Sequence, residues 1–341
     1  MMRLLTTVLI FLLCACKSGN ETLSFEGETM GTTYRVVVIV DTAETEPAVI
    51  ETAIDTTLAD VNQKMSNWDS TSEISKFNNA KSTQLIEISS ELAEVMAIAF
   101  DVYEASERSF DVTLGPLIDL WGFGKRSPNS PIPTDEDIAE SMEKVGQAKM
   151  IELRRDPNTL AKKHPEATVH LDAIAKGFGI DQLSKALQQL GIENYLVEIG
   201  GDLITSGKNP NGVDWRIGIE QPFGGDRAVE EVIEFTGLGM ATSGDYRNYF
   251  EEDGVRYSHI IDANTGRPIA HKTASVTVLA ESAALADAWA TALLVLGKER
   301  GMHISEKFHL AAFFIWRQEG INELKFVTES SSRFKLLKAI E

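Results

Sequence analysis

An aspartate within an apolar segment is the first candidate for chemistry. The segment 281–297 reads ESAALADAWATALLVLG, and its apolar residues recur at the three-and-four spacing of a buried helix. Asp287 lies in the middle of this segment, and no Lys or Arg stands within one turn on either side. Because a carboxylate removed from water is costly unless it is paired, Asp287 needs a partner that the neighbouring sequence does not supply.

Thr291 follows Asp287 by four residues, so the hydroxyl and the carboxylate share one face of the predicted helix. Two hard oxygen ligands at this spacing suit Mg²⁺, which binds few protein oxygens and completes its coordination with water and phosphate. The alternative is a buried Asp held by backbone donors, with the Thr hydroxyl bonded back to its own helix.

Two further stretches carry groups suited to acid–base chemistry or anion binding. In SHIIDANTG, His259 ends a predicted strand beside a loop, where an imidazole can act as a general base or make only a structural hydrogen bond. In HLDAIAKGFGID, His170, Asp172 and Lys176 bracket a predicted strand-to-helix junction. The free N–H groups and the lysine there would attract an anion, although an ordinary helix start with a solvated lysine has the same pattern.

The charge balance restricts the partners of this protein. The chain has 341 residues, of which 43% are hydrophobic, and a formal net charge of −19. That charge repels nucleic acid and anionic membrane surfaces, so we expect no nucleic-acid partner. A phosphate-bearing ligand would need a local basic group or a bound cation. The sequence contains neither a P-loop nor a Rossmann glycine motif.

The first residues are typical of an export signal. MMRLLTTVLIFLLCAC places one Arg before an apolar run of about ten residues, which is too short for a membrane span. Leu13-Cys14-Ala15-Cys16 resembles the bacterial lipoprotein processing box, which predicts a signal peptide over 1–15, a lipid on Cys16 and a tether over 16–23. We therefore expect an exported protein on the periplasmic side of the cell envelope, with a lipid anchor in a membrane. A plain signal peptide is the alternative.

Beyond the tether, predicted strands and helices are interspersed. Alternating and β-branched runs predict strands within 23–40, 150–163, 194–207, 215–222, 231–237, 255–262 and 273–280. Helical spacing predicts helices over 47–64, 89–108, 173–190 and 281–297, and another that begins at Thr134. The fold class is therefore mixed α/β.

Eight motifs occur in the order seen in the ApbE-type flavin transferases, which the chain resembles from 24 to 297. They are MGTTY, MSNWDSTSEISKFN, SFDVTLGPLIDLWGFG, AIAKGFGID, VEIGGDL, ATSGDYRNYF, SHIIDANTGRPI and ADAWATALLVLG. The resemblance implies an α+β, T-fold-like architecture with mixed sheets flanked by helices. It also implies a flavin transferase domain over 24–328 and a C-terminal tail over 329–341.

Members of this family are similar in binding FAD and Mg²⁺ and in transferring the FMN half to a Thr or Ser hydroxyl of a partner protein, with release of AMP. By motif position, Asp287, Thr291 and the main-chain carbonyl of Ala173 look like the metal ligands, so a divalent cation would neutralise Asp287. His259 looks like the catalytic histidine. The residues that look like FAD contacts are Met30 and Trp68 at the isoalloxazine ring, and Ser109, Phe110, Asp111, Lys176 and the backbone of Ile261.

One motif departs from the family pattern. Where the family commonly has Asp-Leu-Ser or Asp-Leu-Gly, this chain has His170-Leu171-Asp172. Residues two apart on a strand face the same side, so Asp172 can replace the acid, and either His170 or Asp172 is a candidate contact to the nucleotide.

The resemblance implies an FAD:protein FMN transferase whose acceptors are membrane redox-pump subunits. Two other functions fit the same residues. With water as the acceptor, the protein would be a Mg²⁺-dependent FAD pyrophosphatase that produces FMN and AMP. Without turnover, it would be an FAD-binding lipoprotein.

Overall fold

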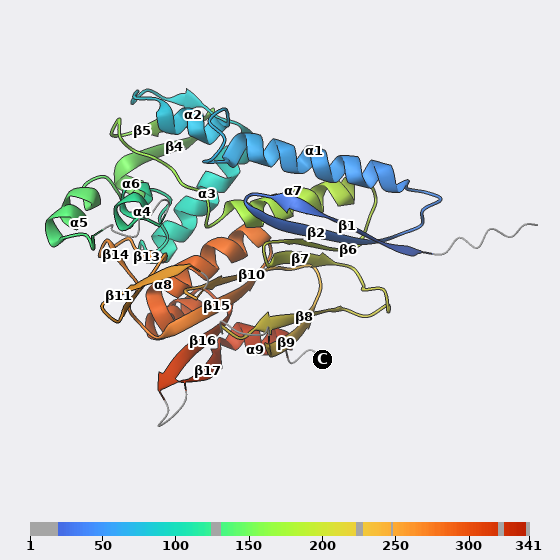
Figure 1. The fold of residues 1–341 in the computed structure, drawn as a ribbon. Coiled ribbons are helices and arrows are strands. Elements are labelled where there is room, and N and C mark those ends of the chain that lie inside the picture. The colour runs from blue at the N-terminus through green and yellow to red at the C-terminus, as the bar shows by residue number, and fades with distance from the viewer. Residues whose placement is uncertain (1–19, 124–130, 223–227, 247, 320–323, 339–341) are drawn as a thin grey trace, which may run out of the picture.

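The computed structural model describes residues 20–123, 131–222, 228–246, 248–319 and 324–338. This part of the chain is built on an eight-stranded sheet with the order β1-β2-β6-β7-β10-β15-β16-β17 (Figure 1). Its strands are β1 (Glu21–Thr29), β2 (Thr32–Val40), β6 (Asn194–Ile199), β7 (Asp202–Ser206), β10 (Gly239–Gly244), β15 (Thr273–Ala280), β16 (Ala311–Glu319) and β17 (Leu324–Ser330). The mixed α/β class is confirmed. Each described strand pair is antiparallel, however, which corrects the expectation of mixed sheets.

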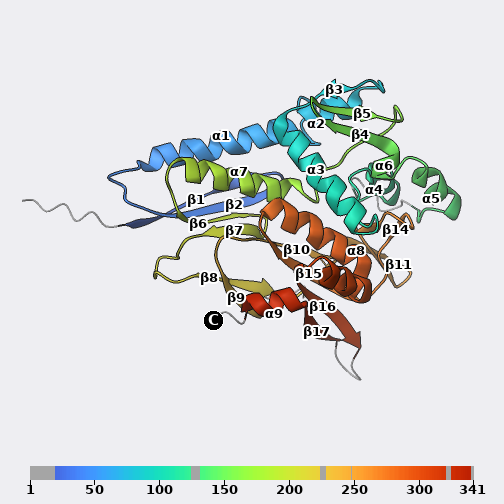
Figure 2. The same ribbon diagram turned by 180° about the vertical axis from the view of Figure 1, so that it is seen from behind.

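Long helices cover one face of this sheet (Figure 2). They are α1 (Pro47–Met65), α3 (Ser90–Ala105), α7 (Ala175–Gln189) and α8 (Ala283–Lys307). Helix α8 packs on β10 and β15, and α7 packs on β6 and β7. Helix α1 in turn packs on α7, and α3 packs on α8. The two inner helices, α7 and α8, therefore lie between the sheet and the outer helices.

Strand β2 shows why both faces of the sheet are buried. Its run of β-branched residues alternates in direction, as strand geometry requires. Val36 and Val38 are buried with Ile54 of α1 and Ile180 of α7. Val37 points the other way, into a separate core. A continuous apolar strand is thus satisfied by one core on each side.

The second core lies on the face opposite the helices. There, β8 (Trp215–Glu220), β9 (Val229–Phe235) and α9 (Ser332–Lys338) cover the sheet. Phe334 of α9 is fully buried and stacks on Phe313 of β16, with ring centroids 5.3 Å apart. The segment assigned to a C-terminal tail therefore contributes to the core. The sheet also starts at Glu21, inside the predicted tether.

Short elements surround the ends of α3 and α8 and complete the described fold. The helices among them are α2 (Glu73–Asn79), α4 (Gly115–Trp121), α5 (Asp135–Met142) and α6 (Gln147–Met150). The strands are β3 (Ile86–Glu87), β4 (Ile151–Arg155), β5 (Asn158–Lys162), β11 (Tyr249–Glu252), β12 (Val255–Ser258), β13 (Ile261–Asp262) and β14 (Arg267–Pro268). They form one three-stranded sheet, β3-β5-β4, and the two-stranded ribbons β11–β12 and β13–β14.

One local expectation was wrong. The stretch before α7 forms no strand, and α7 begins at Ala175 rather than 173, after a turn. The predicted end of the helix at 297 is confirmed by a break in α8 at Gly297, whose φ of 72° and ψ of 176° are not helical, and a second helical stretch continues to Lys307. Within the described ranges, no helix has the length and hydropathy needed to cross a membrane. The predicted signal peptide and Cys16 lie outside the described residues.

Candidate functional site

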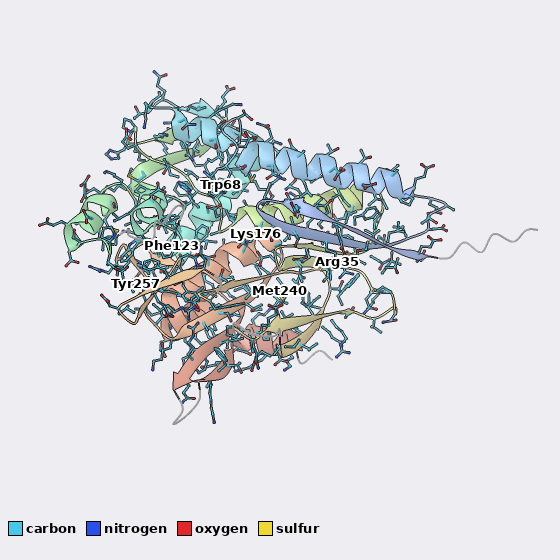
Figure 3. All side chains as sticks on the ribbon, viewed as in Figure 1. Arg35, Trp68, Phe123, Lys176, Met240 and Tyr257 are labelled. Atoms are coloured by element: carbon cyan, nitrogen blue, oxygen red, sulfur yellow. The ribbon has the colours of Figure 1, made fainter. Side chains whose placement is uncertain are left out.

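A cavity of about 330 Å³ lies where the β6–β7 turn, the end of β10, the first turn of α7 and the N-terminal half of α8 meet. Its wall gathers residues that the sequence places far apart. The predicted site residues on this wall are Ser109, Phe110, Asp111, His170, Asp172, Ala173, Lys176, His259, Ile261, Asp287 and Thr291. A neighbouring cavity of about 160 Å³ is lined by Met30 and Trp68, and Asp172 and Lys176 line both cavities. In Figure 3, Lys176 lies near the centre of the molecule, below Trp68.

The turn between β1 and β2 positions Met30. The two turn residues, Met30 and Gly31, have φ values of 50° and 74°, which match the twist of a two-residue hairpin but are unusual for methionine. The Met30 side chain reaches α7, where a Cβ on Gly179 would lie 2.8 Å from its Cε atom. Trp68 follows α1 and is 79% exposed. A thioether and an exposed indole beside the same cavity suit a flat ring ligand.

Asp287 has a partner that the local sequence does not show. The Lys176 Nζ atom lies 3.3 and 3.2 Å from its two carboxylate oxygens, and the Gly177 N–H donates to Oδ2 at 3.2 Å. Asp287 thus pairs with a lysine of α7, and it also has a backbone donor of the kind that the alternative to a metal site predicts. Burial nevertheless raises the pKa of Asp287 to about 6, and the nearby charge of Asp202 acts in the same direction.

Asp202 is a site residue that sequence reasoning missed. It is 3% exposed, begins β7 and lines the cavity. Its Oδ2 lies 2.7 Å from Lys176 Nζ, while its Oδ1 accepts from the Thr242 N–H at 3.1 Å. Although burial alone would lower the pKa of Lys176, the charges of Asp202 and Asp287 raise it. The Gly200-Gly201 pair before Asp202, with both φ values positive, was the available signal for a tight turn.

The remaining oxygens near Asp287 fit a hard cation. Thr291 lines the cavity one turn after Asp287, and its hydroxyl lies 2.9 Å from that of Ser243 in β10. Ala173 lines the same wall. Among the described residues there is no cluster of three or more His, Cys, Asp or Glu side chains suited to a metal. A carboxylate, hydroxyls and a carbonyl are ligands that Mg²⁺ accepts when water and phosphate complete its shell.

His259 is held in one tautomer. Its Nδ1 lies 2.8 Å from the main-chain oxygen of Asn248, and because a carbonyl can only accept, Nδ1 carries the proton. The neutral ring therefore has its lone pair on Nε2. Burial lowers the pKa of His259, although the Asn248 contact and the charge of Asp245 oppose this shift. A neutral, oriented imidazole that is partly exposed at a cavity wall can accept a proton.

Two features fix the segment that holds His259. A series of ring contacts runs from Trp121 through Tyr257 and Phe250 to Phe123, and the Phe123 ring lies T-shaped to the His259 imidazole, with ring centroids 6.5 Å apart. Figure 3 shows Phe123 and Tyr257 on the same side of the molecule.

The second feature is an ion pair just before Asn248. Asp245 is buried, and its carboxylate accepts both terminal nitrogens of Arg317, at 2.6 and 2.7 Å. The Arg256 guanidinium donates to the main-chain oxygen of Asp245 at 2.9 Å. This buried bidentate pair ties the loop between β10 and β11 to β16, so the carbonyl that orients His259 stands on a fixed support.

Asp111 and the His170-Leu171-Asp172 segment differ from the sequence expectation in detail. Asp111 accepts bonds from the N–H and hydroxyl of Thr113 and from the Gln147 N–H, so it holds its own loop while lining the cavity. His170 and Asp172 lie on coil, so the argument from strand alternation fails. Both still reach the cavity wall, with Asp172 exposed and His170 partly buried, and burial lowers the pKa of His170.

Comparisons with known proteins identify the family of this chain. The sequence pattern of the ApbE family matches residues 30–314. The FAD:protein FMN transferase of Haemophilus influenzae is 45% identical over 331 residues, which cover 95% of this chain and 94% of that protein. The protein of the same name from Vibrio cholerae is 42% identical, with 96% of each chain covered.

Solved structures show the same fold. The flavin transferase ApbE from Vibrio cholerae matches with a TM-score of 0.84 and 41% identity, covering 93% of this chain and 99% of that one. The apo form of the Pseudomonas stutzeri flavinyl transferase ApbE matches with a TM-score of 0.84 and 35% identity, covering 94% and 97%. The family pattern, the similar sequences and the shared fold together show that this chain belongs to the ApbE family.

Proposed function

We propose that this protein is an FAD:protein FMN transferase that uses Mg²⁺ and modifies a Thr or Ser hydroxyl of an acceptor protein. The observation that carries the proposal is the single cavity in which Asp287, Thr291, Lys176 and His259 meet. This cavity combines an oxygen site for a cation, an ammonium group for a phosphate oxygen and a base at the wall. The names and structures of its relatives support the same activity.

The reaction breaks the phosphoanhydride bond of the FAD pyrophosphate and forms a phosphoester bond to the acceptor. The acceptor oxygen forms a bond to the phosphorus of the FMN half, the bond from that phosphorus to the bridging oxygen breaks, and the electron pair leaves with AMP. The hydroxyl proton moves to Nε2 of His259, which the Asn248 carbonyl leaves unprotonated in the neutral ring. Met30 and Trp68 would hold the isoalloxazine ring from the second cavity.

Asp287, Thr291 and the carbonyl of Ala173 would hold the cation. Bound there, Mg²⁺ would offset the negative charge that develops on the pyrophosphate oxygens. Asp287 is 3% exposed, so the cation side of the cavity is shielded from water. His259, the proposed base, is in contrast partly exposed, so a protein hydroxyl can reach it.

We further propose that Cys16 carries a lipid, which would place the enzyme on the periplasmic side of the cell envelope. The sequence LCAC, which ends at Cys16, supports this. Its acceptors would then be exported loops of membrane redox-pump subunits. Cys16→Ser should release the protein from the membrane fraction, and an unchanged membrane fraction would refute the anchor.

The test is incubation of the purified enzyme with FAD, Mg²⁺ and an exported acceptor domain that bears an exposed Thr. The acceptor should gain the mass of FMN while AMP appears in equal amount. His259→Asn should lose both products and still bind FAD, whereas His164→Asn, at an exposed histidine, should keep full activity. Rapid AMP release without any acceptor gaining FMN would replace this proposal with the pyrophosphatase. If no product forms under any condition, the protein binds FAD without turnover.

A further inference from the structure

Three charged side chains meet in the cavity with unequal contacts. Lys176 Nζ is 2.7 Å from the nearer oxygen of Asp202 but 3.2 Å from the nearer oxygen of Asp287. Both carboxylates are almost fully buried. Lys176 is the one Lys or Arg among the described residues of the cavity wall. The lysine is therefore shared, and it is held more closely by the strand residue than by the helix residue.

The two carboxylates are fixed by different backbones. Asp202 uses its other oxygen to accept the Thr242 N–H from β10, while Asp287 accepts the Gly177 N–H from α7. The stem of Lys176 passes over Gly200, where an added Cβ would lie 3.5 Å from its Cδ atom. The ammonium can thus stay with Asp202 without any movement of Asp287.

The three side chains do not neutralise one another. One ammonium against two buried carboxylates leaves the group with an excess negative charge, which attracts a cation. A cation bound to Asp287 would repel the ammonium from that carboxylate. If Lys176 had Asp287 as its sole partner, the two would form a neutral pair, and the lysine would compete directly with the cation.

We propose that Asp202 is a positioning residue that retains Lys176 when a divalent cation takes the Asp287 carboxylate. This inference rests on the cation site of the proposed function. The retained ammonium then lies beside the cation with donors free for a pyrophosphate oxygen. Asp202 therefore allows one small cavity to hold two positive groups for the same anion.

The experiment measures Mn²⁺ binding to the FAD-free protein by electron paramagnetic resonance, without turnover. Asp287→Asn should abolish binding at this site. Asp202→Asn should weaken Mn²⁺ binding by about tenfold or more, because Lys176 then pairs with Asp287 alone. Asp119→Asn is the matched control, since it removes an exposed carboxylate that does not line the cavity, and it should change the affinity by less than about threefold.

The decisive variant combines Asp202→Asn with Lys176→Met. Removing the competing ammonium should return the Mn²⁺ affinity close to that of the native protein, which neither general damage to the fold nor a lost metal ligand would do. Failure of the double variant to recover would overturn the inference and make Asp202 a direct ligand or a structural residue. Unchanged affinity in Asp202→Asn would also overturn it while leaving the cation site intact. If Asp287→Asn binds Mn²⁺ like the native protein, both the cation site and this inference fail.

Discussion

Gly177 offers a sharp test of how the site is assembled, because it lies where α7 meets the first turn of α8. A Cβ built on Gly177 would stand 2.2 Å from the Ala283 main-chain oxygen and 2.7 Å from the Cα of Ala284. Both are backbone atoms, which cannot rotate away. Gly177→Ala therefore has to push the two helices apart, and with them the Gly177 N–H that binds Asp287.

The close contact and the intrinsic helix preference predict opposite changes in the free energy of unfolding for Gly177→Ala. In a helix interior without close neighbours, Ala is favoured over Gly by about 1 kcal/mol, so the substitution would stabilise the protein. Overpacking costs about 1–3 kcal/mol, and a clash with backbone belongs at the upper end of that range. We expect a net loss of about 2 kcal/mol in the free energy of unfolding, which lowers Tm by roughly 3 °C in a chain of this size.

The assay is thermal unfolding by calorimetry, paired with Mn²⁺ binding. Gly179→Ala is the matched control on the same helix, since its added Cβ would meet the flexible end of Met30. It should change Tm little and weaken FAD binding, while Gly177→Ala lowers Tm and weakens Mn²⁺ binding together. A higher Tm for Gly177→Ala would refute the reasoning, because it would show that the helices do not approach as described.

Further predictions concern other parts of the molecule. Trp68→Ala should remove most of the quenching of tryptophan emission on FAD binding without lowering Tm, since the indole is 79% exposed; equal quenching would exclude stacking there. Lys64 holds the pKa of Glu91 down to about 2 from 4.5, so this stabilisation is present above pH 4.5 and is lost toward pH 2. Glu91→Gln should flatten that part of a stability–pH curve by at most about 1 kcal/mol, as the pair is partly exposed. Lys162, 2% exposed, donates to the main-chain oxygens of Asn78 and Ala80, so Lys162→Met should cost about 3 kcal/mol in denaturant unfolding.

The residues of the site could be predicted from the sequence because they lie in motifs that follow one another in the same order as in the family. Helical spacing placed Asp287 and Thr291 on one face, and the structure has both on one cavity wall. The partner of Asp287 could not be found in this way, since Lys176 is 111 residues away in the chain. Periodicity reports which face of an element is buried, but it does not report which other element covers that face.

Local conformation explains the other errors. The alternation argument for His170 and Asp172 assumed a strand, yet this stretch gains its hydrogen bonds as coil, with the His170 N–H donating to the Val112 oxygen at 2.7 Å. The tail over 329–341 was implied only by the family resemblance, which names no packing partner for this segment. One aromatic residue, Phe334, was enough to anchor it in the second core.

The position of the charges follows from backbone packing rather than from loops. Gly239 of β10, like Gly177, would place a Cβ within 2.4 Å of the Ala283 backbone, so a strand and a helix both approach the start of α8 closely. This approach brings the Asp287 carboxylate within reach of Lys176 on α7, and β10 supplies the Thr242 N–H that fixes Asp202. Because rigid elements fix both carboxylates and the backbone of Lys176, the proposed cation site would exist before a ligand binds. What remains adjustable is the ammonium of Lys176, a long side chain between two fixed carboxylates.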